Sequence, residues 1–199
     1  MNKLLAIVLG FFGLLGLLVV WGISINNTII NHEESVKRDW GQVQNVYQRR
    51  LDLVPNLVES VKGAAKHEKE TLQSVIEARS NVAKLSAESM TDLANDPAKL
   101  KQFQQAQSAL GSTLSRLMVV VERYPELKAN QNFLELQSQL EGTENRIAVE
   151  RKRFNDSVRV YNGAIRVFPG SLIAGFRNFK ERPYFEAAPE AEKAPQVKF

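Results

Sequence analysis

Four charged side chains fall on otherwise apolar helical stripes and are the first candidates for chemistry. They are Glu68, Arg79, Glu144 and Arg151. One interpretation is that they pair across helices and fix the register of a bundle, a use that buried polar groups have in helical proteins. The alternative is a binding or proton-handling site inside the bundle. The first interpretation is favoured, so the four residues are structural or interaction candidates.

Metal-binding and catalytic motifs are not apparent in the sequence. Di-metal helical bundles use a Glu-x-x-His pattern, but the two histidines, His32 and His67, are preceded at that spacing by Ile29 and Ala64. The absence of cysteine removes thiolate ligands and a cysteine nucleophile. Serine, histidine and aspartate are not grouped as a triad. We therefore expect no catalytic, cofactor-binding or metal-binding residue, and we do not expect an enzyme.

The N-terminal segment is long and apolar enough to anchor the chain in a membrane. No charged side chain lies between Lys3 and Glu33, and the 22 residues of Leu4–Ile25 are almost entirely apolar. As a helix they would extend about 33 Å, enough to cross a hydrocarbon core of about 30 Å. A cleaved signal peptide is the alternative, but its apolar region is about 7–15 residues long. We predict a transmembrane anchor over residues 1–25, with Trp21 as an interfacial anchor.

The charges that flank this segment predict its orientation. Lysine and arginine near a span favour the cytoplasmic side. Lys3 and the α-amino group lie close to the span, whereas Lys37 and Arg38 follow it at a distance. The expectation is a single-pass protein of the bacterial inner membrane with its body on the periplasmic or extracytoplasmic side. A cytoplasmic body is the alternative.

The rest of the chain has helical periodicity nearly throughout. Apolar residues recur every three or four positions in four stretches, without the alternation of strands. The breaks are Pro55, which suits the first turn of a new helix, the polar Ser86–Pro97 segment, Tyr124–Pro125 and Phe168–Gly170. This predicts an all-α fold, with a long antiparallel up-down-up-down four-helix bundle over residues 26–169. The second and fourth breaks would then lie at the membrane end, and the first and third at the far end.

The segment after the bundle, residues 170–185, is basic and aromatic. It is expected to fold back and cover the base of the bundle, or to lie on anionic headgroups as an amphipathic element. Residues 186–199 are rich in proline, alanine and charged residues and are predicted to be disordered. The candidates for contact with a membrane surface or a partner are the apolar and aromatic residues Leu172, Ile173, Phe176, Phe179, Tyr184 and Phe185.

The formal net charge of +4 raises the question of nucleic-acid binding. The cations alternate with acids along the predicted helices, as expected of solvated helix faces. No nucleic-acid recognition motif is present. We therefore expect no nucleic-acid partner.

Seven stretches of the sequence form a recognisable set: Arg49–Gly63, His67–Glu68, Ala78–Arg79, Tyr124–Ala129, Thr143–Ala148, Tyr161–Asn162 and Ile165–Pro169. Together they resemble the LemA family of bacterial membrane proteins. The resemblance covers about residues 26–185 and implies an N-terminal membrane helix followed by a long helical bundle. It implies no established enzymatic activity, and a branch associated with magnetosomes resembles membrane-remodelling factors. The four charged candidates lie in or near these stretches.

These observations favour a non-enzymatic, membrane-anchored helical scaffold or adaptor of the bacterial cell envelope. Its expected partners are the lipid bilayer, unidentified proteins and further copies of itself, because the chain has a single anchor and no reaction chemistry. Membrane remodelling or lipid-surface sensing through residues 170–185 is the alternative. A ligand-binding or enzymatic bundle is a third and less favoured hypothesis.

Overall fold

The computed structural model describes residues 3–63, 65, 67–89 and 92–186, and every regular element within them is an α-helix. The all-α class and the N-terminal apolar helix predicted from the sequence are confirmed. Residues 187–199, most of the predicted disordered tail, lie outside the described residues. The helices are α1 (Lys3–Lys62), α2 (Lys69–Ser89), α3 (Pro97–Val121), α4 (Pro125–Lys128), α5 (Gln131–Arg166) and α6 (Gly170–Arg177).

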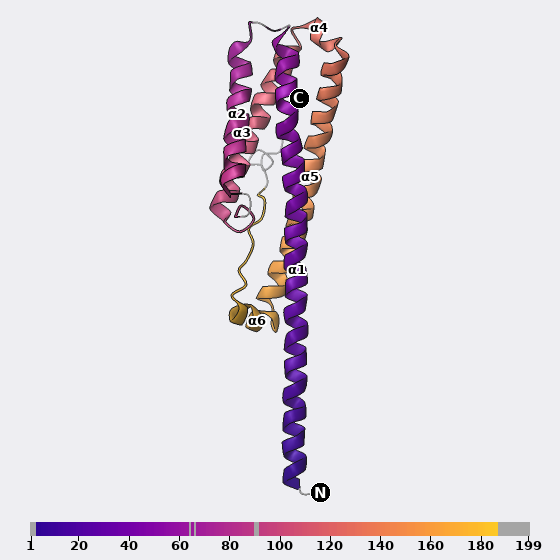
Figure 1. Ribbon diagram of the computed structural model, residues 1–199, viewed down its shortest axis with the longest axis vertical. Helices are drawn as coiled ribbons and strands as arrows, with labels where there is room; N and C mark the ends of the chain where they lie inside the picture. Colours follow the sequence, from indigo (N-terminus) through magenta and orange to yellow (C-terminus); the bar gives the residue numbers. More distant parts are fainter. Residues whose placement is uncertain (1–2, 64, 66, 90–91, 187–199) are drawn as a thin grey trace, which may run out of the picture.

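Helix α1 is one continuous element of 60 residues, about 90 Å long. Its first part is long and apolar enough to cross a membrane, and the large apolar side chains from Leu4 to Ile23 are exposed. Ile29 is the first buried residue of the same helix, and from Val36 and Trp40 onward core residues recur every three or four positions. The predicted anchor and the first helix of the body are therefore a single rod (Figure 1).

The predicted break at Pro55 is wrong. Pro55 lies inside α1, which continues to Lys62, and the break falls instead between Gly63 and Glu68. Proline in a helix interior leaves the carbonyl four residues earlier without its amide donor. That carbonyl belongs to Leu51, and it accepts a hydrogen bond from Nε of Arg79 on α2 at 2.9 Å. A side chain from the neighbouring helix therefore replaces the donor that proline removes.

The other three breaks are where the sequence predicted them. Asp96 caps α3, because its side chain accepts hydrogen bonds from the amides of Ala98 and Lys99. Tyr124–Pro125 separates α3 from the short α4, and Asn130 caps α5 in the same way as Asp96 caps α3. The fourth break, at Phe168–Gly170, separates α5 from α6.

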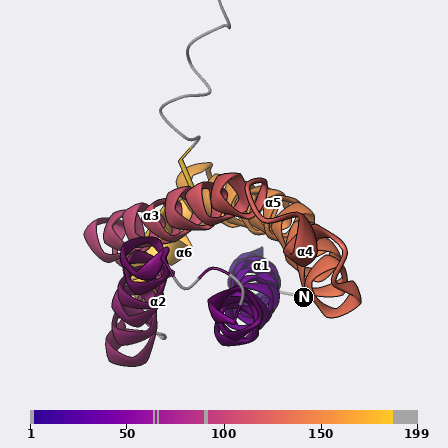
Figure 2. The same ribbon diagram turned by 90° about the horizontal axis from the view of Figure 1, so that it is seen from above.

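The long helices pack as two pairs. Helix α1 packs along α5, α2 packs along α3, and α1 also contacts α2 (Figure 1). Seen from above, α3 and α5 curve around one side of α1 (Figure 2). The core between the helices contains the buried side chains of Val54 and Val75 and an aromatic cluster in which Trp40 contacts Phe154 and Phe185. Because α3 and α5 are not a closely packed pair, they leave a groove whose floor is α1.

The two turns expected at the membrane end lie at different heights along α1. Helix α6 meets the end of the predicted anchor, because Cδ1 of Ile173 lies 3.9 Å from where a Cβ of Gly22 would be. The turn between α2 and α3 lies farther from the N-terminus (Figure 1). The difference follows from the helix lengths. Helices α2 and α3 have 21 and 25 residues, whereas α5 has 36 residues and extends farther toward the N-terminal end of α1.

Candidate functional site: a polar groove between α3 and α5

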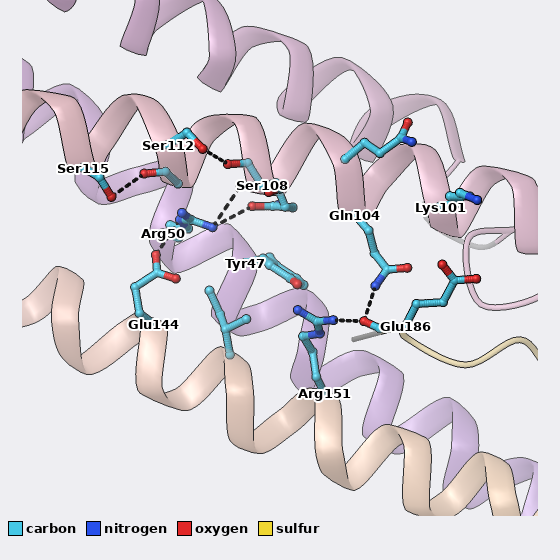
Figure 3. A pocket seen from close by; sticks show the side chains of 14 residues that line it. Tyr47, Arg50, Lys101, Gln104, Ser108, Ser112, Ser115, Glu144, Arg151 and Glu186 are labelled. Carbon is cyan, nitrogen blue, oxygen red and sulfur yellow. Dashed lines mark hydrogen bonds and ion pairs between the residues drawn. The ribbon is translucent and has the colours of Figure 1, made fainter. Parts of the chain in front are cut away.

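The groove between α3 and α5 has a volume of about 550 Å³. Helix α3 contributes one wall, including Gln107 and Ser112, and α5 contributes the other, including Glu144 and Arg151. The floor is formed by Tyr47 and Arg50 of α1, and Figure 3 shows these side chains converging from the three helices. This volume lies in the range of small-molecule and cofactor sites, and most of the residues that line the groove are of polar types.

Arg50 is the central side chain of the groove and is only 4% exposed. Its Nε lies 2.7 Å from Oε1 of Glu144, and its Nη1 donates to the side-chain and main-chain oxygens of Gln107, at 3.2 and 3.4 Å. Nη2 points to Gly111, where an added Cβ would lie 3.0 Å away. Arg50 therefore links α1 to both walls, and the absence of a side chain at position 111 makes room for it.

Burial changes the pKa values of this pair in opposite directions. Loss of hydration lowers the pKa of Arg50, although Glu144 opposes the shift. Loss of hydration also raises the pKa of Glu144, and Arg50 reduces that rise. Burial raises the pKa of Tyr47 as well. Each charge is therefore costly to bury, and the ion pair compensates part of that cost.

At its lower end, near the start of α3, the groove holds a main-chain carbonyl. Gln104 of α3 and Arg151 of α5 donate hydrogen bonds to the carbonyl oxygen of Glu186, at 3.2 and 2.7 Å (Figure 3). Arg151 also lies over the ring of Phe185, 4.9 Å from its centroid. The two walls of the groove are thus bridged by an extended segment of the protein itself.

The four charged candidates do not pair with one another. Glu144 and Arg151 line the groove, as described, but they have different partners. Arg79 binds the Leu51 carbonyl. Glu68 lies at the far end of the body, where it accepts hydrogen bonds from Arg123 at 2.9 Å and from the Tyr124 hydroxyl at 3.3 Å. The suggested pairing of charges between the second and fourth predicted helices is therefore not observed.

Part of the aromatic segment folds back on the helices, which is one of the two arrangements that its sequence suggested; contact with anionic headgroups stays a prediction. Phe185 is buried in the aromatic cluster, while Ile173 and Phe179 pack partly against the core, so the segment folds back on the helices. Leu172 and Phe176 of α6 remain 61% and 94% exposed. Tyr184 and, at the end of the predicted anchor, Trp21 are also exposed.

Sequence reasoning missed the polar residues at the centre of the groove. Arg50 was not singled out, although it lies three residues after Tyr47 and four before Val54, on the apolar stripe of α1. Gln107 occupies a buried position of α3 in the same way. Polar side chains at stripe positions were the available signal for both.

Metal ligands do not gather in the described part of the chain. No group of three or more His, Asp or Glu residues within it is arranged to hold a metal ion. The acids of the groove are instead Glu144, which is paired with Arg50, and Glu186, at its mouth. The chemistry that this groove offers is hydrogen-bond donation from amides and guanidinium groups.

Comparison with known proteins identifies the family. A sequence model of the LemA family matches residues 39–199. The chain belongs to the LemA family. It is 34% identical over 95 residues to the magnetosome protein MamQ of Magnetospirillum gryphiswaldense, covering 46% of this chain and 35% of that protein. It is 22% identical over 148 residues to the protein LemA of Metamycoplasma hominis, covering 74% of this chain and 63% of that one.

A second magnetosome relative gives a similar result. MamQ 2 of Paramagnetospirillum magneticum is 32% identical over 87 residues, covering 44% of this chain and 32% of the relative. The chain thus spans about a third of the length of the magnetosome relatives that it matches. The resemblance to the LemA family stated from the sequence is confirmed.

Proposed function

We propose that this LemA-family protein is a non-enzymatic, membrane-anchored helical scaffold or adaptor of the bacterial cell envelope. The observation that carries the proposal is the continuity of α1, which has exposed apolar residues in its first part and core residues in its second. A rod of this kind holds the body at a fixed distance from the bilayer. The long helices then act as one antiparallel four-helix bundle with large faces for binding partners.

Assembly with other proteins and with further copies of the chain is part of this proposal. The body exposes large apolar side chains away from α6, including Ile76 on α2 and Val119 on α3, at 52% and 69%. Exposed apolar side chains of this kind are candidate contact points, although single ones are common on protein surfaces. Crosslinking in intact cells, followed by purification in mild detergent, tests the proposal. A protein that stays monomeric and without crosslinked partners would contradict it.

We also propose that the protein is a single-pass component of the inner membrane with its body on the extracytoplasmic side. The supporting observation is the positive charge of Lys3, which directly precedes the apolar segment. A reporter fused after Phe199 distinguishes the two orientations. Activity of a periplasm-dependent reporter is expected, and activity of a cytoplasm-dependent one would reverse the assignment.

Membrane-surface binding through α6 is the second candidate function. Helix α6 lies beside the end of the predicted anchor at Gly22, and it exposes Leu172 and Phe176 there. Replacing both exposed residues with serine is expected to weaken co-sedimentation of the protein body with anionic liposomes, because less apolar surface enters the interface. Val119→Ser, on α3, is the matched control. Equal binding by the wild type, the double serine variant and Val119→Ser would rule this function out.

A further inference from the structure

Residues 178–186 show how this protein binds an extended polypeptide. The side-chain amide of Asn162 on α5 binds both the amide and the carbonyl of Arg182, each at 2.9 Å. Asn155 binds both main-chain groups of Phe185 in the same way, also at 2.9 Å. Seven residues of α-helix rise about 10.5 Å, and three residues of extended chain span about 10 Å. Helix α5 therefore presents main-chain binding groups at the spacing of an extended polypeptide.

The groove repeats this type of recognition beyond Glu186. Gln104 and Arg151 hold the Glu186 carbonyl from opposite walls. One turn farther along α3, Gln107 lies beside Arg50, so a second glutamine–arginine pair borders the groove. The buried Nε2 of Gln107 has no hydrogen-bond partner among the described residues. A buried donor without a partner is costly, and a main-chain carbonyl placed as the Glu186 carbonyl is placed would satisfy it.

The length and charge of the groove define what it can hold. It continues past Arg50 to Met118 on α3 and Gln137 on α5, where Glu141 and Glu144 also line it. From Lys101 to Met118, α3 rises about 26 Å, which accommodates roughly eight extended residues. Lys101 lines the lower end without a carboxylate partner among the described residues. An acidic side chain is the complementary group at that end.

We propose that the groove between α3 and α5 binds an extended segment of a partner protein, through its main chain and with an acidic side chain near Lys101. The inference rests on the proposed scaffold function, since it states which kind of partner segment is recognised. The Gln107 amide nitrogen binds a carbonyl oxygen of that segment, and Arg50 holds the Gln107 side chain in place through its Oε1. Gly111 leaves room for the Arg50 guanidinium at the centre of the groove.

Fluorescence anisotropy with three labelled octapeptide pools tests the inference on the full chain in detergent micelles. Each peptide carries a single charged or amide side chain, at its first or its last position, because Glu141 and Glu144 line the end of the groove away from Lys101. That residue is glutamate in one pool, glutamine in the second and lysine in the third. We expect the glutamate pool to bind most tightly. Ser112→Trp fills the groove from an exposed position and should weaken that binding at least about tenfold. Gln102→Trp, exposed on the same helix but outside the groove lining, should change it less than about twofold.

A third variant tests the amide donor of Gln107, whereas the tryptophan variants test whether the groove must be empty. Gln107→Glu keeps an acceptor for Arg50 but replaces the free amide donor with a carboxylate oxygen. It should therefore weaken the glutamate pool at least about tenfold while the far-ultraviolet circular dichroism stays unchanged. A merely structural role for Gln107 would leave peptide binding as it is in the wild type.

Three results would overturn the inference. The first is that no pool binds, and the second is that Ser112→Trp and Gln102→Trp bind the glutamate pool equally. The third is a photocrosslinker at Ser108 that reacts with residues 187–199 of the same chain, because the chain itself would then occupy the groove. If the pools fail while in-cell crosslinking still finds partners on other faces, only this inference is wrong and the scaffold function stands.

Discussion

Replacing Arg79 with methionine removes the guanidinium that binds the Leu51 carbonyl but keeps the apolar stem of the side chain. Leu51 is buried, so its carbonyl loses its partner without gaining water. A hydrogen bond from a charged donor to a buried acceptor contributes about 2 kcal/mol, or roughly 30-fold in the unfolding equilibrium. The loss has this size only because Pro55 cannot donate an amide to the same carbonyl.

The prediction is therefore a coupling between two positions on different helices. In a Pro55→Ala background the amide of residue 55 can bind the Leu51 carbonyl, and Arg79→Met should then cost less than about 0.5 kcal/mol. Urea unfolding in detergent measures both values, with the fluorescence of the buried Trp40 recorded in a Trp21→Phe background. The coupling energy expected from the double-mutant cycle is about 1.5 kcal/mol.

A matched control separates this coupling from a general effect of removing a charge. Arg116→Met, exposed on α3, should change stability by less than about 0.5 kcal/mol in either background. An equal cost of Arg79→Met with proline or with alanine at position 55 would refute the reasoning. In that case the Arg79 hydrogen bond would not compensate for the proline.

Three further predictions concern the aromatic cluster, α6 and the groove. Phe185→Ala should destabilise the body by about 3 kcal/mol in thermal or urea unfolding, because Phe185 is buried against two aromatic rings, whereas Phe176→Ala should have little effect. Gly170→Ala should displace α6, because its Cβ would clash with the Ala164 carbonyl; faster hydrogen exchange over residues 170–177 measures this, and unchanged exchange would contradict it. Burial raises the pKa of Glu144, so the folded state holds this proton more tightly than the unfolded chain and the associated stability is lost as the pH rises above about 4.3. Unfolding measured across pH should show this loss in the wild type and not in Glu144→Gln.

Periodicity was sufficient to predict the helical class because the apolar stripes are long and strict. It also placed three of the four breaks, where proline and capping residues act locally. The break at Pro55 was misplaced because its compensation comes from Arg79, which is distant in sequence. Local sequence signals cannot report a donor supplied by another helix.

The candidate site was harder to predict for a related reason. A charged residue on a stripe indicates burial, and Glu144 and Arg151 do line the groove. Their partners depend on which helices face each other, and α5 faces α1 rather than α2. Arg50 and Asn155 reveal their roles only when α1 and residues 178–186 are placed beside α5.

Site-specific crosslinking in intact membranes tests the scaffold function most directly. The sequence has no cysteine, so single substitutions such as Ile76→Cys and Val119→Cys introduce unique reactive positions on the exposed body. With a homobifunctional maleimide, which links two thiols, the scaffold account predicts covalent dimers at one or both positions. With a photoactivatable maleimide at the same positions, it predicts adducts to other proteins. Recovery of the uncrosslinked monomer alone with both reagents, at these and the other exposed positions of the body, would contradict the account.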